Sequence, residues 1–186
     1  MTGSKKTNLA IIGGRACGKS TIAQAVSTAL DRELFILDLL IEQKAGQSIP
    51  AIIESSGWPA FRELEYAVLQ DVSTSSGAVW DCGGGIVCEQ DDTGEQTFSD
   101  RKAALLREHA QVVYIDVPLE VQNSRLQADH ASRPALTNVS PVAELEAIMA
   151  LRRPWYQQVA DLRVETAGKS VEEIVQEIKA FWETAK

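Results

Sequence analysis

Cysteine, long hydrophobic runs and basic charge are all scarce in this sequence of 186 residues. Its three cysteines, Cys17, Cys82 and Cys88, form no C-x-x-C pair, which excludes a cysteine zinc site and a disulfide-built fold and favours free thiols in a reducing compartment. No apolar run approaches the ~18 residues that a membrane helix requires, and no signal peptide precedes the first apolar segment. We therefore expect a cytoplasmic protein without a membrane partner.

The charge balance limits the kinds of ligand further. The chain has 18 Lys and Arg against 26 Asp and Glu, a net charge of −8. A general binder of nucleic acid needs a basic face, so no nucleic-acid partner is expected. An anionic ligand would have to be held by a local cluster of Arg and Lys. The length and the hydrophobic content of 45% fit one domain, residues 1–186, which we expect to be monomeric.

A glycine-rich segment near the N-terminus matches the phosphate-loop pattern G-x-x-x-x-G-K-[ST]. Its residues, with the one that follows, are Gly13, Gly14, Arg15, Ala16, Cys17, Gly18, Lys19, Ser20 and Thr21. The apolar run 8–12 before it predicts a buried strand and the pattern 21–30 after it predicts a helix, which is the context that such a loop needs. Backbone N–H groups would then cradle the phosphates of a nucleotide, Lys19 would reach the β- and γ-phosphates, and the Ser20 hydroxyl would bind Mg²⁺. ATP and Mg²⁺ are the expected cofactors.

Strand and helix patterns alternate along the rest of the chain. Further strands are predicted at 34–37, 77–82, 112–117 and 162–166, and helices at 60–69, 119–127, 142–152 and 171–185. This alternation predicts an α/β fold, a three-layer α/β/α arrangement around a central five-stranded parallel sheet. Ligands of such folds bind beyond the carboxyl ends of the strands, where the phosphate loop, Asp38 and Gly83–Gly85 would converge.

Two segments lack clear periodicity. Residues 89–96 are acidic and polar, and we expect a solvated loop there. Residues 129–138 contain Arg133-Pro134, and their pattern fits either a flexible lid over the phosphates, at about 128–140, or a plain surface loop.

Six motifs, in order, resemble the shikimate kinases, a branch of the nucleoside-monophosphate-kinase-like phosphate-loop proteins. They are the phosphate loop, Asp38 with Ile41-Glu42, Gly57 to Glu65 (G-x-x-x-F-R-x-x-E), Gly83–Gly85, Arg125 with Arg133-Pro134, and Arg152 to Asp161 (R-x-P-x-Y-x-x-x-A-D). The resemblance spans about residues 8–180. It implies a phosphate-loop kinase fold with a substrate-binding helical segment at about 39–70. It also implies that ATP phosphorylates shikimate to shikimate 3-phosphate.

The resemblance also implies roles for the arginines. Arg62 and Arg152 would clamp the carboxylate of shikimate, because a guanidinium binds a carboxylate as a bidentate fork. Glu65, three residues after Arg62, would hold that guanidinium in place. From the residues alone, Arg62 with Glu65 could equally be a surface ion pair, and Arg152 could simply occupy a helix C-terminus. Arg125 would lie against adenine, or else face solvent.

Three further elements complete the implied site. Asp38 would accept hydrogen bonds from the ring hydroxyls and help to take the proton of the attacking one, or it could be only a turn residue. The backbone of Gly83, Gly84 and Gly85 would allow the substrate a close approach. Arg133 on the lid would neutralise charge on the transferred phosphoryl group. The expected catalytic residues are thus Lys19, Asp38 and Arg133.

The chain departs from the family pattern at two positions and in one length, because the segment between Gly85 and the strand at 112–117 is longer than the family leads us to expect. The family usually has D-x-D where this chain has Ile36-Leu37-Asp38, so Ile36 replaces the Asp that organises Mg²⁺ through water. Ala16 replaces a usual glycine, which is tolerable only if its φ is negative. Asp81, two residues before the triple glycine, could supply the missing carboxylate. Alternatively, it could be a buried partner for a loop N–H or for Lys19.

Three functions stay open at this point. The first is shikimate kinase. The second is a kinase of the same fold for another small hydroxy acid or polyol, such as gluconate. The third is a catalytically weakened nucleotide-binding protein with a regulatory role, which the missing Asp suggests.

Overall fold

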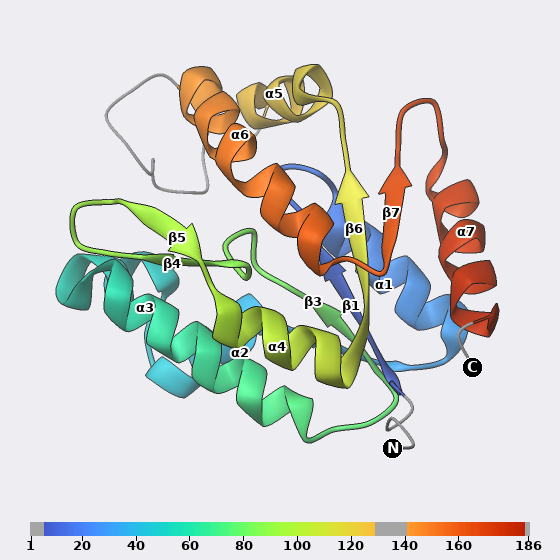
Figure 1. Cartoon of the computed structure of the whole chain (residues 1–186), viewed down its shortest axis with the longest axis horizontal. Helices are drawn as coiled ribbons and strands as arrows, with labels where there is room; N and C mark the ends of the chain where they lie inside the picture. Colours follow the sequence, from blue (N-terminus) through green and yellow to red (C-terminus); the bar gives the residue numbers. More distant parts are fainter. Residues whose placement is uncertain (1–5, 129–140, 185–186) are drawn as a thin grey trace.

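A five-stranded parallel sheet forms the centre of the molecule, as the alternating pattern predicts (Figure 1). The computed structural model describes residues 6–128 and 141–184. The strands follow the order β2-β3-β1-β6-β7 across the sheet. Their bounds are β1 Asn8–Ile12, β2 Glu33–Ile36, β3 Ala78–Asp81, β6 Ala110–Asp116 and β7 Leu162–Glu165.

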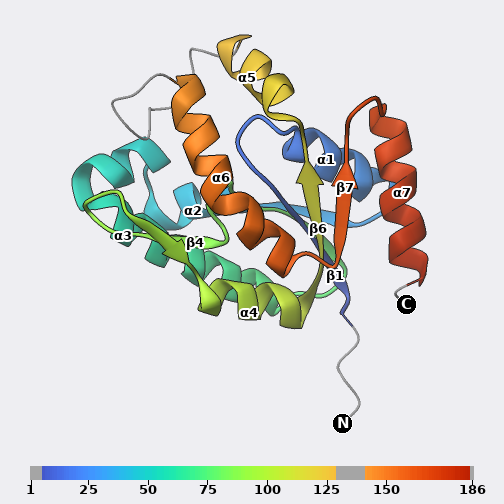
Figure 2. The same ribbon diagram turned by 45° about the horizontal axis from the view of Figure 1, so that its top comes forward.

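Helices cover both faces of the sheet, because successive strand residues point to opposite sides. On β1, Leu9 and Ile11 pack toward α1 (Lys19–Leu30) and α7 (Val171–Thr184). Ala10 and Ile12 instead belong to the core on the other side. The helices there are α2 Leu37–Ala45, α3 Ile49–Ser73, α4 Asp100–His109 and α6 Pro141–Val159. Figure 2 shows the resulting layers, with α5 (Leu119–Ala128) beyond the carboxyl end of β6.

The long helix α3 is two helical segments joined at a break. Ser48 caps its start by accepting a hydrogen bond from the N–H of Ala51, at 3.4 Å. Gly57 has φ 79° and ψ 173°, a conformation outside the helical region that glycine adopts without steric cost. Pro59 follows in the first turn of the second segment, where its missing N–H matters least. The break therefore explains how the G-W-P sequence fits within one element.

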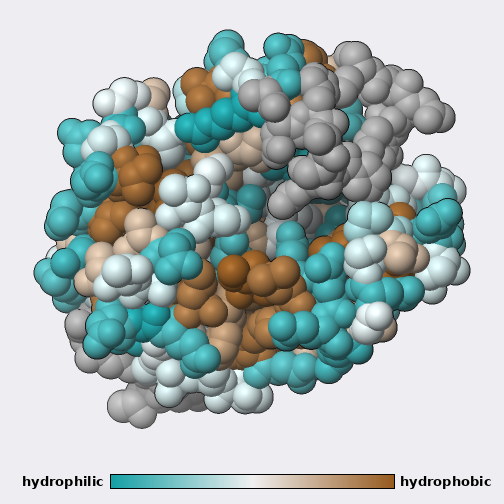
Figure 3. Space-filling view, turned by 180° about the vertical axis from the view of Figure 1, so that it is seen from behind, coloured by the Kyte–Doolittle hydropathy of each residue, from teal (hydrophilic) through white to brown (hydrophobic). Residues whose placement is uncertain are grey.

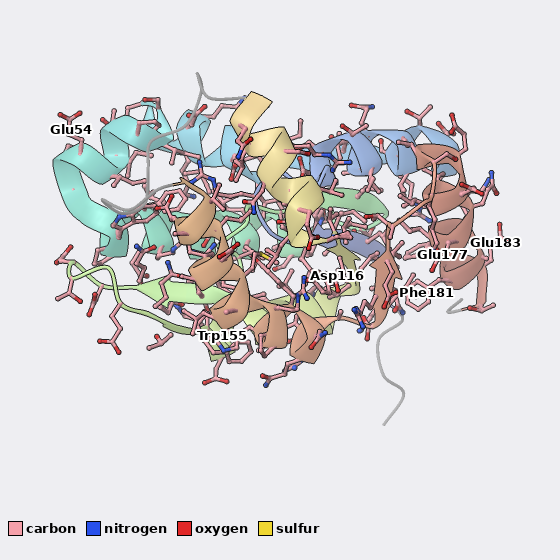
Figure 4. The ribbon with its side chains drawn as sticks, turned by 90° about the horizontal axis from the view of Figure 1, so that it is seen from above. Glu54, Asp116, Trp155, Glu177, Phe181 and Glu183 are labelled. Atoms are coloured by element: carbon pink, nitrogen blue, oxygen red, sulfur yellow. The ribbon has the colours of Figure 1, made fainter. Side chains whose placement is uncertain are left out.

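The segment 89–96, predicted to be a solvated loop, forms part of a β-hairpin, of which only the exposed turn 91–95 fits the prediction. Cys88–Gln90 (β4) and Gln96–Phe98 (β5) form an antiparallel hairpin, and the helix α4 follows it. The ring centroid of Phe98 lies 6.2 Å from that of Trp155, a residue of α6. Trp155 is labelled in Figure 4. The acidic residues therefore form the turn of this hairpin, while buried side chains of its strands, including Gln90, face the interior.

The rear of the molecule alternates hydrophilic areas with hydrophobic ones (Figure 3). Among residues 6–128 and 141–184, the exposed large hydrophobic side chains come from four different helices: Leu39 (α2), Val121 (α5), Leu151 (α6) and Val171 (α7). Among the described residues, no helix combines the length and the hydrophobicity needed to cross a bilayer.

Candidate active site

The phosphate loop connects the carboxyl end of β1 to the first turn of α1, as predicted. A cavity of about 200 Å³ adjoins it, lined by Lys19, Ser20, Asp38 and Asp81 among others. The Lys19 ammonium folds over the loop and donates a hydrogen bond of 2.9 Å to the Gly14 carbonyl. N–H groups and the positive end of the α1 dipole therefore face a cavity that also has a lysine at its wall, which suits a phosphate.

Ala16 contradicts the expectation of a negative φ. Its φ is 56°, in the left-handed region, where an L-residue with a β-carbon is strained by about 1–2 kcal/mol. Its carbonyl accepts a hydrogen bond of 3.3 Å from Arg125 Nη1. The loop therefore keeps a backbone conformation that glycine would adopt without strain, and the methyl group of Ala16 makes that conformation strained. Arg125 itself lies against the loop, consistent with its predicted place near a bound nucleotide.

A second cavity, of about 320 Å³, opens beside the first. Four residues line both cavities: Arg15, Asp38, Gly83 and Gly84. Asp38 lies in the first turn of α2, two residues after β2 ends, and it lines both cavities. The other wall is formed by α2 and α3 and includes Trp58 and Phe61. The volume is within the lower range for a small-molecule site.

Arg62 lies at the inner wall of this second cavity and is only 4% exposed. Its Nη1 donates to Glu65 Oε2 at 2.9 Å, which confirms the predicted pairing and rules out a surface ion pair. The same Glu65 oxygen accepts a hydrogen bond of 2.8 Å from Lys102, whose side chain is fully buried. Burial opposes the charge of Glu65, but Arg62 and Lys102 outweigh it and lower the pKa of that carboxyl. Burial likewise opposes the charge of Arg62, and Glu65 outweighs it, so the pKa of the guanidinium is raised.

Arg152, from α6, reaches the same cavity from the other side and is 3% exposed. Its Nε donates to Gln96 Oε1 and its Nη1 to the Gly84 carbonyl, both at 2.8 Å. The hydroxyl of Tyr156 donates to the same carbonyl. These contacts fix the middle of the glycine segment and hold the guanidinium against it.

Both pocket arginines retain a buried N–H group without a partner. Arg62 Nε and Arg152 Nη2 find no hydrogen-bond acceptor among residues 6–128 and 141–184. A buried donor left unpaired costs about 1–3 kcal/mol, and more when it is charged. Arg62 and Lys102 share the negative charge of Glu65, and the cavity is also lined by Arg15, Arg152, Asp38 and Glu42. The pocket therefore offers positively charged donors without an acceptor, which suit an anionic group.

The triple glycine has a steric role in addition to the one predicted. A β-carbon on Gly85 would lie 2.2 Å from Arg62 Nη1, and one on Gly83 would lie 2.8 Å from Asp38 Oδ1. Real β-carbons do not approach other atoms so closely. Glycine at positions 83 and 85 therefore leaves room for Asp38 and Arg62, while the close approach of a substrate to Gly83–Gly85, which line the second cavity, stays a prediction.

Sequence reasoning missed three side chains that position the arginines. Gln90 lies near Arg62, with an Nη2 to Oε1 distance of 3.4 Å, while Gln96 and Lys102 make the contacts described above. The one sequence feature that could have pointed to these three side chains is the unexpected length of the segment between Gly85 and β6. Arg133 and the predicted lid at about 128–140 lie outside the described residues, except for residue 128 at the end of α5.

Asp116 forms a separate charged cluster at the carboxyl end of β6 (Figure 4). It accepts hydrogen bonds of 2.9 Å from both Tyr114 and Arg163, and Arg153 approaches it to 3.3 Å. This cluster holds Arg153 away from the pocket, so of the two adjacent arginines only Arg152 enters the site.

The geometry agrees with what comparisons find. A family model described as shikimate kinase matches residues 15–183. The chain is 38% identical to a shikimate kinase of Geobacter sulfurreducens over 174 residues, 94% of this chain and 90% of that protein. It is 33% identical to one of Leptospira biflexa over 172 residues, 92% and 93% of the two chains.

The chain belongs to the shikimate kinase family. A solved structure of a shikimate kinase from Acinetobacter baumannii, in complex with shikimate, superposes with a TM-score of 0.84 and 29% identity over 97% of this chain and 95% of that one. Membership confirms the predicted phosphate-loop kinase fold and the assignment as a kinase of a family that uses ATP. The roles of individual side chains stay predictions.

Proposed function

We propose that this protein is a shikimate kinase that transfers the γ-phosphoryl group of ATP to a ring hydroxyl of shikimate. The observation that carries the proposal is the pair of buried, unpartnered guanidinium N–H groups on Arg62 and Arg152. The side chains of both arginines line a cavity that shares Asp38 with the phosphate-loop cavity. A small acceptor with one carboxylate would satisfy both donors and present its hydroxyls toward Asp38.

The chemistry requires positioning and charge neutralisation rather than a covalent enzyme intermediate. The acceptor hydroxyl oxygen bonds to the γ-phosphorus as the bond to the β–γ bridging oxygen breaks, which leaves ADP. Asp38 accepts the proton of the attacking hydroxyl. Lys19 stabilises the charge that moves onto the phosphate oxygens, and Arg133 would add to it from the lid.

Magnesium fits the oxygen donors at the phosphate loop. The Ser20 hydroxyl and the Asp81 carboxylate line one cavity, and Mg²⁺ prefers such hard oxygen ligands while keeping several waters. When bound, the ion neutralises phosphate charge and orients the γ-phosphoryl group. Among the described residues, no group of three or more His, Cys, Asp or Glu could form a metal cage, so we assign the remaining ligands to phosphate oxygens and water.

We further propose that residues 1–186 act as one kinase domain, in which α2 and α3 bind the substrate. A monomer is supported by the distribution of exposed hydrophobic side chains over four helices. A cytoplasmic location is supported by the three cysteines, all buried and unpaired.

A coupled assay of ADP formation tests the proposal. Wild-type protein with ATP and Mg²⁺ should release ADP only when shikimate is added, and Lys19→Ala should abolish the release while the protein stays folded. ADP release that depends on gluconate or another hydroxy acid, and not on shikimate, would instead assign the site to that acceptor. Nucleotide binding without transfer to any acceptor would indicate a regulatory protein.

The carboxylate contact has its own test. Shikimate carboxamide keeps the ring hydroxyls but lacks the negative charge that Arg62 and Arg152 would bind. A hydrogen bond to a charged group contributes about 1.5–3 kcal/mol, so two lost bonds should lower kcat/KM by at least ~100-fold. Equal kcat/KM for the acid and the amide would exclude this role for the arginine pair.

A further inference from the structure

Ile36 and Asp81 are neighbours across the sheet. They are the last residues of β2 and β3, and the parallel register pairs them directly. Adjacent strands lie about 4.8 Å apart, and residues paired in register project to the same face of a sheet. A carboxylate on β3 can therefore reach nearly the same space as one on β2.

The face on which Asp81 lies is the one that carries the phosphate loop. Asp81 also pairs with Ile11 of β1, and Val79, two residues earlier on β3, packs in the core against α1. By alternation, the side chain of Asp81 projects toward the α1 side. Ser20, in the first turn of α1, lines the same cavity.

Asp81 has no hydrogen-bond or ion-pair partner among the described residues. It is 6% exposed, and no side chain or N–H group among the described residues donates a hydrogen bond or forms an ion pair with its carboxylate. Lys19, the nearest expected candidate, donates to Gly14 instead. Burying a carboxylate is costly unless it is paired or binds a cation. The Asp81 carboxylate lines the phosphate cavity and is therefore placed to bind a cation that enters it.

We propose that Asp81 supplies the protein carboxylate of the magnesium site, on β3 instead of β2, and so replaces the one that Ile36 lacks. This inference rests on the proposed function, because the ion is the one that accompanies the nucleotide. Ser20 and Asp81 would hold the ion from α1 and β3, and Asp38 would stay with the acceptor hydroxyl.

Titration of the protein with ADP, with and without Mg²⁺, tests the inference without turnover. In the wild type, Mg²⁺ should tighten ADP binding. In Asp81→Asn, this gain in ADP affinity should be smaller by about 10- to 100-fold, which is the usual cost of losing an outer-shell partner of a metal. The affinity for ADP without Mg²⁺ should stay unchanged. Asp100→Asn, which removes the same charge from an exposed position of α4, should behave as the wild type.

A double variant makes the test specific to the shared face. Ile36→Asp combined with Asp81→Asn returns a carboxylate to the paired position and should restore most of the Mg²⁺ effect. If Asp81→Asn does not fold, Asp81→Ser serves in its place. A full Mg²⁺ effect in the Asp81 variant, or no recovery in the double variant, overturns the inference. Wild-type protein that shows Asp81-dependent Mg²⁺ binding but no shikimate-dependent ADP release would refute the proposed function and leave this inference standing.

Discussion

Replacing Lys102 by methionine removes one positive charge from the buried cluster while nearly preserving the length of the side chain. Lys102 is fully buried and donates to Glu65 and to the Cys88 carbonyl. Removing one partner of a buried ion pair costs about 3–5 kcal/mol, and Glu65 keeps Arg62, so we expect the lower end of that range. A domain with the usual stability of about 5–15 kcal/mol stays folded after such a loss, and urea unfolding would measure it.

The same change should weaken substrate binding. A carboxylate bound to Arg62 would lie roughly 10 Å from Lys102, along the chain of contacts through Glu65. At an effective dielectric constant of about 20, one unit charge at ~10 Å contributes about 1.7 kcal/mol, which corresponds to a 10- to 20-fold rise in KM for shikimate. The value of kcat should change much less, since Lys102 touches neither reacting group.

Steady-state kinetics with shikimate, on protein shown to be folded, would measure this effect. Lys44→Met is the matched control, because Lys44 forms an exposed ion pair with Asp71 and such pairs contribute about 0–1 kcal/mol. It should leave KM unchanged. Adding Glu65→Gln to Lys102→Met returns the net charge of the cluster to its original value and should recover part of the affinity. A folded Lys102→Met protein whose KM lies within twofold of the wild type would refute the argument from charge.

Three further predictions follow from backbone strain, hydrogen bonding and close packing. Ala16→Gly should relieve left-handed strain of ~1–2 kcal/mol at an entropic cost of ~0.5–1 kcal/mol. The free energy of unfolding, measured in urea, should therefore rise by about 0.5–1 kcal/mol. A decrease would mean that the strain is absent. Gln96→Ala removes an acceptor of Arg152 and should raise KM for shikimate about 3- to 10-fold with kcat little changed, whereas the exposed neighbour change Thr97→Ala should have no effect. Gly85→Ala places a methyl group 2.2 Å from Arg62 Nη1. This change should destabilise the fold by about 1–3 kcal/mol and abolish shikimate-dependent turnover. Wild-type activity would contradict this packing.

The central sheet could be predicted because its strands are short apolar runs followed by helical periodicity. The phosphate loop and the spacing of Arg62 and Glu65 were equally legible, since both are local patterns of sequence. The hairpin β4–β5 could not be predicted, because its sequence is polar and polar residues usually face solvent. Only the structure shows that Gln90 and Gln96 contact buried arginines. Lys102 illustrates the same limit. A lysine is seldom fully buried, and only the fold brings Glu65 to it.

Helix α4 was missed for a related reason. It is rich in charged residues, and of its ten positions only Lys102, Ala103 and Leu106 are buried, so its hydrophobic pattern is weak. Ala16 shows a different failure. The expectation of a negative φ assumed that an alanine avoids strain, whereas the phosphate loop imposes its own backbone shape on the residue that occupies it.

The pairing of Ile36 with Asp81 has a consequence for how members of such a family are compared. Positions that are distant in sequence but paired across parallel strands are close to interchangeable in space. An acidic group could therefore move from one strand to the next during evolution through two separate substitutions. A comparison made column by column would score the first as a loss and the second as noise. Relatives that lack an expected acidic residue on one strand should be inspected on the adjoining strand before they are set aside as inactive.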